Sequence, residues 1–203
     1  MGERSVTHDF RTELDYGEHE RLRPFWERVF RARFPDFERM DPVISLSEQR
    51  RGHDWHVTFG AKPHQVVRRI QTKSRRGEPW PDIALEYRHT WDDGRPRKDG
   101  WIELADQDYE YFAYGFPEAG DAHVFPWPEL RRAWLNNRER WRALGSKSWA
   151  LRGSTNQGPP CDGVSSIRAR NSGYWSWSLC VHVDALKEAI VGAMSVSVAP
   201  VKA

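Results

Sequence analysis

Helical periodicity is strongest in two parts of the chain. Between positions 21 and 34 the apolar residues recur every three or four positions, as on one face of a helix. They are Leu22, Phe25, Trp26, Val29, Phe30 and Phe34. Pro24 suits the first turn of that helix, and Pro35 is expected to end it. A second apolar face over 127–144 predicts another helix, which Gly145 is expected to end.

Alternation of apolar and polar residues predicts the strands. The predicted strands are 43–46, 55–59, 64–73, 82–91, 109–116, 122–125 and 174–183. The segment 145–173 is rich in Ser, Gly, Pro and Asn without periodicity and predicts a long loop. Asp184 is expected to cap a terminal helix over 185–191. This order predicts an α/β (α+β) fold, with a central mixed sheet flanked by helices.

The size and composition favour one domain with an aromatic core. A chain of 203 residues fits a single domain over 1–203. We expect its core over about 18–144, the long loop over 145–173, and a C-terminal strand and helix over 174–192. The 11 Trp, 9 Phe and 6 Tyr predict that large rings supply much of the buried area.

Neither a membrane span nor an export signal is expected. No apolar run approaches the ~18 residues that a membrane span needs. The first residues, MGERSVTHDF, lack the apolar segment of a signal peptide. We therefore expect no membrane partner and a cytoplasmic location.

One acid, one amide and one lysine occupy two consecutive predicted strands. Asp54 stands at the start of the strand 55–59, and alternation places Gln71 and Lys73 on one face of the strand 64–73. If these strands pair as a hairpin, the three side chains converge. They then offer two oxygen ligands for a hard divalent cation, with an ammonium beside it. This combination is suited to phosphodiester cleavage.

The same residues carry a resemblance to a known family. Asp54, followed by a strand, a turn and Gln71-Thr72-Lys73, resembles the core of the PD-(D/E)XK nuclease superfamily, with glutamine in place of the second acid. Three flanking segments add to it: QRRGHD at 49–54, DIALEY at 82–87 and GWI at 100–102. Over roughly residues 9–189, the chain is similar to small restriction-endonuclease-like proteins of phages and prophages.

The resemblance implies a fold, a cofactor and catalytic residues. It implies a restriction-endonuclease-like core with a C-terminal elaboration, and catalytic roles for Asp54, Gln71 and Lys73. It implies Mg²⁺ (or Mn²⁺), held by Asp54 and Gln71, and a location in the host cytoplasm if the protein is phage-encoded. An additional acid on the first helix is also implied, and Glu20 is the candidate, with a surface glutamate as the alternative.

Glu86 is the remaining candidate metal ligand. It lies on the predicted strand 82–91, on the same face as Asp82 and Arg88. It is expected either to reach the metal or orient Lys73, or to pair with an arginine across the sheet.

Basic residues cluster although the net charge is only +2. The run 68–76 contains five Arg and Lys and no acid, and the run 131–152 contains seven against Glu139 alone. Clustered cations bind phosphate backbones. The candidate nucleic-acid-binding residues are Arg68, Arg69, Arg75, Arg76, Arg131, Arg138 and Arg142. A solvated arginine-rich helix face and strand edge is the alternative interpretation.

Together these observations predict a divalent-metal-dependent nuclease that hydrolyses DNA. DNA is the expected partner, with RNA and a second copy of the chain as further candidates. The alternative is a catalytically inactive nucleic-acid-binding or partner-binding protein that retains the nuclease fold. Gln71 favours that alternative, because it is a neutral ligand where the family usually has a carboxylate. No P-loop and no G-x-S-x-G elbow occurs, which disfavours nucleotide binding and serine-hydrolase chemistry.

Overall fold

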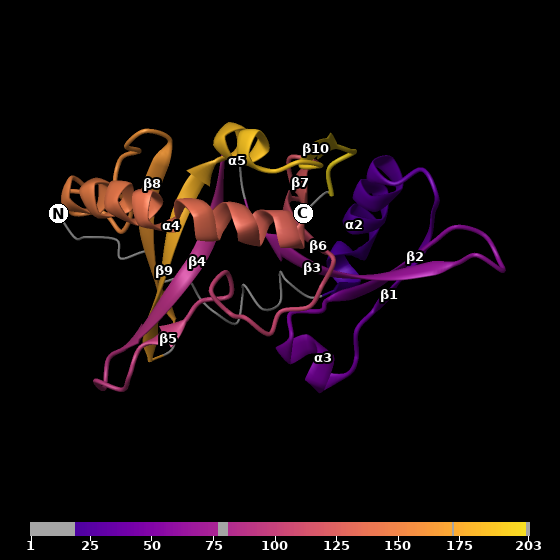
Figure 1. The fold of residues 1–203 in the computed structure, drawn as a ribbon, viewed down its shortest axis with the longest axis horizontal. Coiled ribbons are helices and arrows are strands. Elements are labelled where there is room, and N and C mark those ends of the chain that lie inside the picture. The colour runs from indigo at the N-terminus through magenta and orange to yellow at the C-terminus, as the bar shows by residue number, and fades with distance from the viewer. Residues whose placement is uncertain (1–18, 77–80, 172, 202–203) are drawn as a thin grey trace. The chain divides into compact units, whose positions relative to one another are not determined.

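The computed structural model describes residues 19–76, 81–171 and 173–201. They form a mixed α+β structure with two separate sheets, one of six strands and one of four (Figure 1). The predicted fold class is confirmed. None of the described helices is long and apolar enough to cross a membrane.

The chain divides into two compact units. Of the described residues, unit A comprises 19–76, 81, 105–136 and 183–201, and unit B comprises 82–104, 137–171 and 173–182. Each unit contains one of the sheets. All the residues expected to form the catalytic centre, Asp54, Gln71 and Lys73, belong to unit A.

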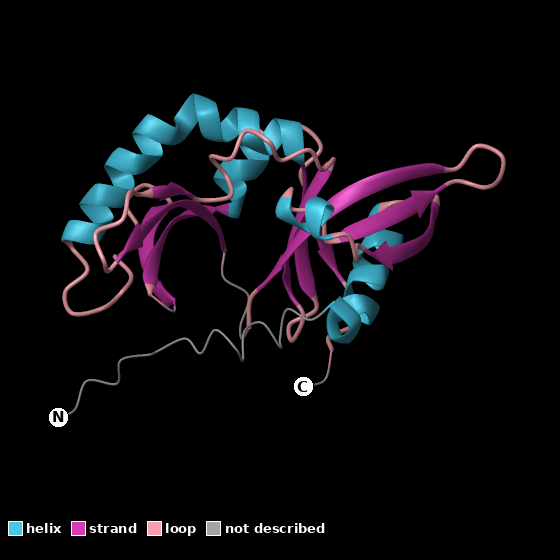
Figure 2. Cartoon of the chain, turned by 90° about the horizontal axis from the view of Figure 1, so that it is seen from below, coloured by secondary structure: helices cyan, strands magenta, loops and turns pink. Residues whose placement is uncertain are grey.

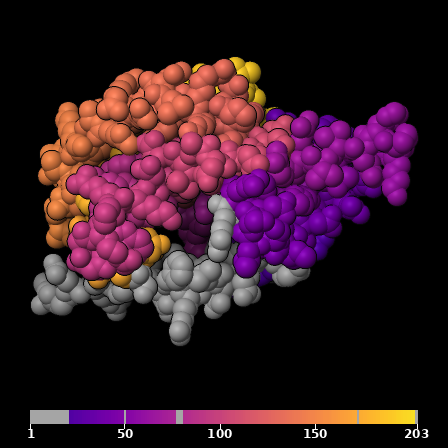
Figure 3. Space-filling model, turned by 60° about the horizontal axis from the view of Figure 1, so that its bottom comes forward, coloured from indigo at the N-terminus to yellow at the C-terminus, as the bar shows by residue number. Residues whose placement is uncertain are grey.

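Unit A contains a mixed sheet of order β1-β2-β3-β6-β7-β10. Its strands are β1 (Phe37–Pro42), β2 (Trp55–Phe59), β3 (Val66–Ser74), β6 (Tyr111–Phe116), β7 (Asp121–Pro126) and β10 (Met194–Ser197). Neighbours are antiparallel except β3 and β6, which are parallel. The predicted β2–β3 hairpin is confirmed, with Trp55 opposite Ile70. Its turn, residues 60–65, protrudes from unit A (Figure 3).

Helix α2 (His19–Arg33) supplies the aromatic core of unit A, as the sequence predicts. Phe25 and Trp26 are fully buried. A Cβ on Gly115 of β6 would lie 2.7 Å from an atom of each of these rings. Glycine at this position therefore lets the helix pack closely on the sheet.

The N-terminal edge of the sheet differs from the prediction. The expected strand 43–46 is wrong: β1 ends at Pro42, and the short helix α3 (Leu46–Arg50) follows. A bulge between Phe37 and Arg39 shifts the register of β1. Its buried residues, Phe37 and Met40, are consequently three positions apart, which hides the period-2 signal.

Unit B contains an antiparallel sheet of order β5-β4-β9-β8. Its strands are β4 (Asp82–Trp91), β5 (Lys98–Asp99), β8 (Val164–Asn171) and β9 (Tyr174–His182). β4 has the predicted bounds, but its sheet partners are β5 and β9. Strand bounds follow from local alternation, whereas sheet membership depends on distant segments.

Helix α4 (Trp127–Ala150) begins in unit A and ends in unit B. Its unit B part, residues 137–150, covers one face of the four-stranded sheet (Figure 2). The expectation that Gly145 ends this helix is wrong. Gly145 is buried within it, and a Cβ there would lie 2.3 Å from Leu179 Cδ2 on β9. The glycine is explained by close helix–sheet packing rather than by a helix end.

The long loop expected over 145–173 is also wrong. This segment contains the last turns of α4 and the strand β8, which pairs with β9. Arg168 of β8 lies opposite Trp177, and Ser166 opposite Leu179. The first three residues of β8, Val164, Ser165 and Ser166, are all buried, and two of them are polar, so the strand shows no apolar alternation. The last helix, α5 (Val183–Ala189), starts two residues before the predicted range.

Strand β7 carries a histidine whose protonation opposes folding. Burial lowers the pKa of His123 from 6.5 to about 4; Lys187 adds to this effect, and Asp121 and Asp184 act against it. Its Nδ1 lies 2.8 Å from Ser195 Oγ. The unfolded chain takes up the proton near pH 6.5, and the folded chain takes it up only near pH 4.

We therefore expect this contribution to stability to be complete above pH 6.5 and to be lost as the pH falls toward 4. The loss amounts to up to about 3 kcal/mol. His123→Asn keeps a polar group near Ser195 and removes the titration. Urea unfolding of both proteins between pH 7 and pH 4 should show the steeper loss in the wild type. If the free energy of unfolding fell equally with pH in the two proteins, His123 would not be the group responsible for the loss of stability.

Candidate active site and its surroundings

The β2–β3 hairpin holds Asp54 against the Gln71-Thr72-Lys73 stretch. The Asp54 backbone N–H donates to the Ile70 carbonyl over 3.0 Å. The Asp54 Oδ2 atom accepts hydrogen bonds from the backbone N–H of Thr72 (2.6 Å) and from its hydroxyl (3.1 Å). The Asp54 carboxylate thus accepts the Thr72 N–H bond in place of a backbone carbonyl. This bond lies just beyond Trp55–Ile70, the last residue pair between β2 and β3. The acid is therefore fixed at the residue between Gln71 and Lys73.

Gln71 and Lys73 share a face of β3 but differ in exposure. Gln71 is 6% exposed, and its Oε1 has no hydrogen-bond partner among the described residues. Leaving a buried acceptor unsatisfied costs about 1–3 kcal/mol, so this oxygen favours a donor or a cation. Lys73 is exposed, and within the described ranges it has no ion-pair partner. An unsatisfied oxygen and an available ammonium thus lie two residues apart.

Other buried polar groups surround Gln71. A Cβ on Gly52 would lie 2.2 Å from Gln107 Oε1, 2.9 Å from Tyr109 Cε1 and 3.2 Å from Gln71 Nε2. Gln107 Oε1 and the Tyr109 hydroxyl are also buried without a hydrogen-bond partner in the described part of the chain. Gly52 has a φ of +83°, a conformation that glycine adopts without strain. The absence of a side chain there leaves room for this polar group of residues.

Tyr109 links this polar group to the acid. Burial raises the pKa of Tyr109, and the charge of Asp54 raises it further, while Arg131 acts in the opposite direction. The phenol therefore remains protonated and can donate a hydrogen bond. Arg131 contributes positive charge to the same region.

The oxygen donors of this region fit Mg²⁺ or Mn²⁺. Both ions prefer carboxylate and carbonyl oxygens, and Asp54 and Gln71 supply one of each. The observation that supports the fit is the buried Gln71 Oε1, because it lacks a donor in the described structure. No nitrogen or sulfur ligand is needed for such an ion.

The other two acids predicted as metal ligands are Glu86 and Glu20. Glu86 lies on β4 in unit B, and its Oε1 is 2.8 Å from His89 Nε2. Its partner is therefore a histidine on the same strand rather than an arginine across the sheet. Glu20 belongs to α2, but its side chain lies outside the part that the structure describes.

Arg69, Arg138 and Arg142, which the sequence predicts to bind phosphate, pair with acids. Arg69 Nη2 lies 2.9 Å from Glu110 Oε1, and its Nη1 lies 2.8 Å from Asp108 Oδ2. Arg138 and Arg142 of α4 both pair with Glu103. These pairs neutralise positive charge that was predicted to bind nucleic acid.

The other four predicted arginines differ in exposure. Arg68 and Arg76 are exposed, whereas Arg75 and Arg131 are half-buried. The basic surface near the hairpin is thus narrower than the sequence predicts.

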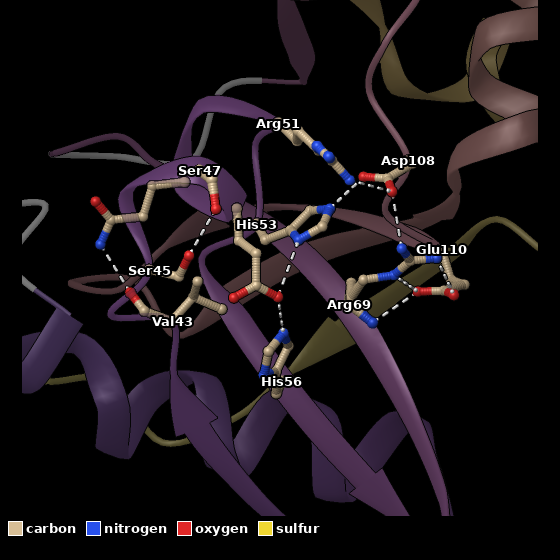
Figure 4. Close-up of polar contacts among 11 residues, drawn as sticks. Val43, Ser45, Ser47, Arg51, His53, His56, Arg69, Asp108 and Glu110 are labelled. Carbon is tan, nitrogen blue, oxygen red and sulfur yellow. Dashed lines mark hydrogen bonds and ion pairs between the residues drawn. The ribbon is translucent and has the colours of Figure 1, made fainter.

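A cluster beside the hairpin was not predicted from the sequence. Glu48 of α3, His53 and His56 of β2 bring one carboxylate oxygen and two ring nitrogens within 4.8 Å of one another. His53 and His56 lie close to one another in Figure 4. His56 Nε2 is 3.1 Å from Glu48 Oε1, and His53 Nδ1 is 3.9 Å from the same atom. The spacing His53-x-x-His56 is visible in the sequence, but the turn that places Glu48 beside it is not.

Asp108 holds His53 from the other side. Its Oδ1 atom hydrogen-bonds His53 Nε2 (Figure 4). Burial opposes the charge on Asp108, but the His53 hydrogen bond, together with Arg69 and Arg51, lowers the pKa of Asp108 below its usual value. Asp108 therefore remains an anion and orients the imidazole.

Unit B carries a cluster of tryptophans and arginines where α4 ends. The Arg168 guanidinium lies 3.9 Å from the ring centre of Trp175, 5.3 Å from Trp149 and 5.5 Å from Trp177. Burial lowers the pKa of Arg168, and two neighbouring arginines add to this effect. Neither Arg152 nor Arg168 has an ion-pair partner among residues 19–76, 81–171 and 173–201. The cluster therefore combines ring surfaces with positive charge that is not neutralised there.

Comparison with known proteins identifies no relative. No protein-family model matches the chain, and no curated protein or solved structure matches it significantly.

Proposed function

We propose that the protein is a divalent-metal-dependent nuclease acting on DNA, with its catalytic centre at Asp54, Gln71 and Lys73. The observation that carries this proposal is the bond from Thr72 to the Asp54 carboxylate, because it fixes the acid to the residue that stands between Gln71 and Lys73 in β3. The resemblance to the PD-(D/E)XK pattern involves the same three residues. The unsatisfied Gln71 Oε1 adds an oxygen that is suited to a hard cation.

In this proposal each side chain has a separate task. Asp54 and Gln71 hold Mg²⁺, which supplies a Lewis acid for water and for the charge that develops on the phosphate. Lys73 places its ammonium beside the reacting phosphate and stabilises the same charge. The exposed Arg68 and Arg76 contact flanking phosphates on the bound strand.

A metal titration tests the proposal. The purified chain is incubated with supercoiled plasmid, single-stranded DNA or RNA, and Mg²⁺ or Mn²⁺ is raised from zero to millimolar concentrations. We expect cleavage that depends on the metal and is abolished by excess chelator. If none of these substrates is cleaved with either metal, the nuclease proposal is wrong.

The second candidate function is nucleic-acid binding without catalysis, and the Trp–Arg cluster of unit B favours it. Single-stranded nucleic acids bind surfaces that combine aromatic rings with cations, each stacked base being worth about 1–3 kcal/mol. Trp149, Trp175 and Trp177 are each partly exposed, and Arg152 and Arg168 supply charge. These features suit an anionic strand better than a neutral partner.

Arg168→Gln is expected to weaken binding to single-stranded DNA. If Arg168 contacts one phosphate, its loss lowers the log–log salt slope by about 0.7. Fluorescence anisotropy of a labelled oligonucleotide at several salt concentrations measures both effects. Arg140→Gln is the matched control, because Arg140 is exposed and already pairs with Asp162 over 2.6 Å. If Arg168→Gln and Arg140→Gln changed the affinity and its salt dependence equally, the Trp–Arg cluster would not be the binding surface.

A further inference from the structure

We infer that Glu48, His53 and His56 form a binding site for one transition-metal ion of the Zn²⁺ class, with Asp108 orienting His53. The site differs in its ligands from the proposed Asp54–Gln71 centre, which offers only oxygens. The inference does not rest on the nuclease proposal. It rests on the local fold, on a buried nitrogen without a partner and on the ligand spacing.

The turn after α3 brings the first two ligands together. The Gly52 N–H donates to the Gln49 carbonyl (2.9 Å), and the His53 N–H donates to the Glu48 carbonyl (3.2 Å). With Gly52 at a φ of +83°, this is the Schellman ending of a helix. The bonds hold His53 beside Glu48, and β2 then carries His56 to the same place. The three ligands are thus positioned by backbone geometry within one unit.

His53 presents a ligand atom that the protein leaves unused. The residue is 1% exposed, and its Nδ1 has no hydrogen-bond partner among the described residues. Its Nε2 bonds Asp108, so in the neutral imidazole the proton lies on Nε2 and Nδ1 carries the lone pair. That lone pair faces Glu48 Oε1 at 3.9 Å, too far for a hydrogen bond. A cation between these two atoms would give His53 Nδ1 the partner that it lacks.

The two separations that involve Glu48 are close to those in a tetrahedral metal site, and all three ligand atoms lie within 4.8 Å of one another. Zinc bonds of about 2.0–2.1 Å to nitrogen and oxygen place neighbouring tetrahedral ligands about 3.3 Å apart. The distances from Glu48 Oε1 to His56 Nε2 and His53 Nδ1 are 3.1 and 3.9 Å. The side chains of Glu48 and His56 are 36% and 34% exposed, which leaves them able to adjust. Their exposure also leaves one coordination position for water, as in three-ligand zinc sites.

The surroundings match those of a metal-ligating histidine. Such a histidine usually donates its second ring N–H to a carboxylate, which fixes the ring and raises its basicity. Asp108 plays this part for His53, and it is held in turn by Arg69 Nη1 over 2.8 Å (Figure 4). Two imidazoles and a carboxylate favour Zn²⁺, Co²⁺ or Ni²⁺ over Mg²⁺.

Metal binding to the full chain tests this inference. The protein is stripped with chelator and titrated with Co²⁺, whose visible absorption becomes intense on tetrahedral coordination, and then with Zn²⁺ in a calorimeter. We expect one ion per chain, displacement of Co²⁺ by Zn²⁺, and no displacement by excess Mg²⁺. Zn²⁺ should also raise the thermal unfolding midpoint, because it binds only the folded site.

Three variants separate this site from other histidines. His56→Ala removes a ligand and is expected to abolish the Co²⁺ spectrum and the Zn²⁺ shift in midpoint. Asp108→Asn weakens Zn²⁺ binding by about 10- to 100-fold, the usual loss when the partner of a ligating histidine is changed. His64→Ala, at an exposed histidine in the β2–β3 turn, leaves binding unchanged.

Two outcomes would overturn the inference: no Zn²⁺ or Co²⁺ binding by the wild type, or equal binding by the wild type and His56→Ala. If His56→Ala does not fold, Glu48→Gln replaces it, because Glu48 is partly exposed and the change preserves its shape. Equal Zn²⁺ affinity of Glu48→Gln and the wild type would then overturn the inference. Cleavage of DNA in Mg²⁺ bears only on the nuclease proposal, so the two can fail separately.

Discussion

Lys73→Ala is expected to reduce Mg²⁺-dependent cleavage of DNA by about 100- to 1000-fold, the usual effect of removing one group that stabilises charge in the transition state. Binding of DNA should stay within a few-fold of the wild type, because other cations contact the strand. Lys73 is exposed and has no ion-pair partner in the described residues, so its loss should not destabilise the fold. The measurements are single-turnover cleavage with saturating protein and binding in the presence of Ca²⁺.

Lys62→Ala is the matched control for this substitution. Lys62 is an exposed lysine in the β2–β3 turn, at the end of the hairpin away from Asp54. Its removal changes the net charge by the same amount and should leave cleavage within two- to three-fold. Retained cleavage in Lys73→Ala, or an equal loss in both variants, would show that Lys73 is not at the reacting centre.

Local patterns predict the core hairpin well. Alternation locates β2, most of β3, and the shared face of Gln71 and Lys73. Antiparallel pairing of these strands then puts Asp54 opposite that stretch. These features depend on short-range periodicity and one tight turn, which is why sequence alone predicts them.

Charge patterns predict less, because the partners of charged side chains are distant in sequence. Arg69 appears as part of a basic run, but Asp108 and Glu110 neutralise it from about 40 residues away in the chain. The same applies to Arg142, whose partner Glu103 lies on another segment of unit B. A run of arginines in the sequence therefore overstates the positive surface.

The Glu48–His53–His56 cluster could not be predicted from the sequence for a similar reason. Its histidines are close in the sequence, yet what makes them a site is the Schellman turn at Gly52 and the contact with Asp108. The glycine is visible in the sequence, but its positive φ and its place at a helix end are not. Five-residue helices such as α3 leave too little periodicity to be predicted.

Substitution of Gln71 distinguishes a catalytic role of this residue from a structural one. Its buried Oε1 has no partner in the described structure, so replacing the amide with an apolar side chain of similar size removes an unsatisfied group. We expect Gln71→Leu to leave the free energy of unfolding unchanged or to raise it by up to about 1 kcal/mol. Cleavage should nevertheless fall by at least about 100-fold, because one of two metal ligands is lost. Activity is thus expected to fall without any loss of stability.

Urea unfolding and cleavage against metal concentration measure the two effects in the same variant. Gln107→Leu is the matched control, since Gln107 is also a buried amide with an unpartnered Oε1, but lies outside β3. Gln107→Leu should have the same effect on the free energy of unfolding as Gln71→Leu. Its cleavage rate should stay within a few-fold of that of the wild type. Gln71→Glu should lower the metal concentration for half-maximal cleavage, because a carboxylate binds a hard cation more tightly than an amide does. Wild-type cleavage in Gln71→Leu would show that Gln71 is not a ligand, and a loss of stability above about 2 kcal/mol would show that its amide has a structural partner.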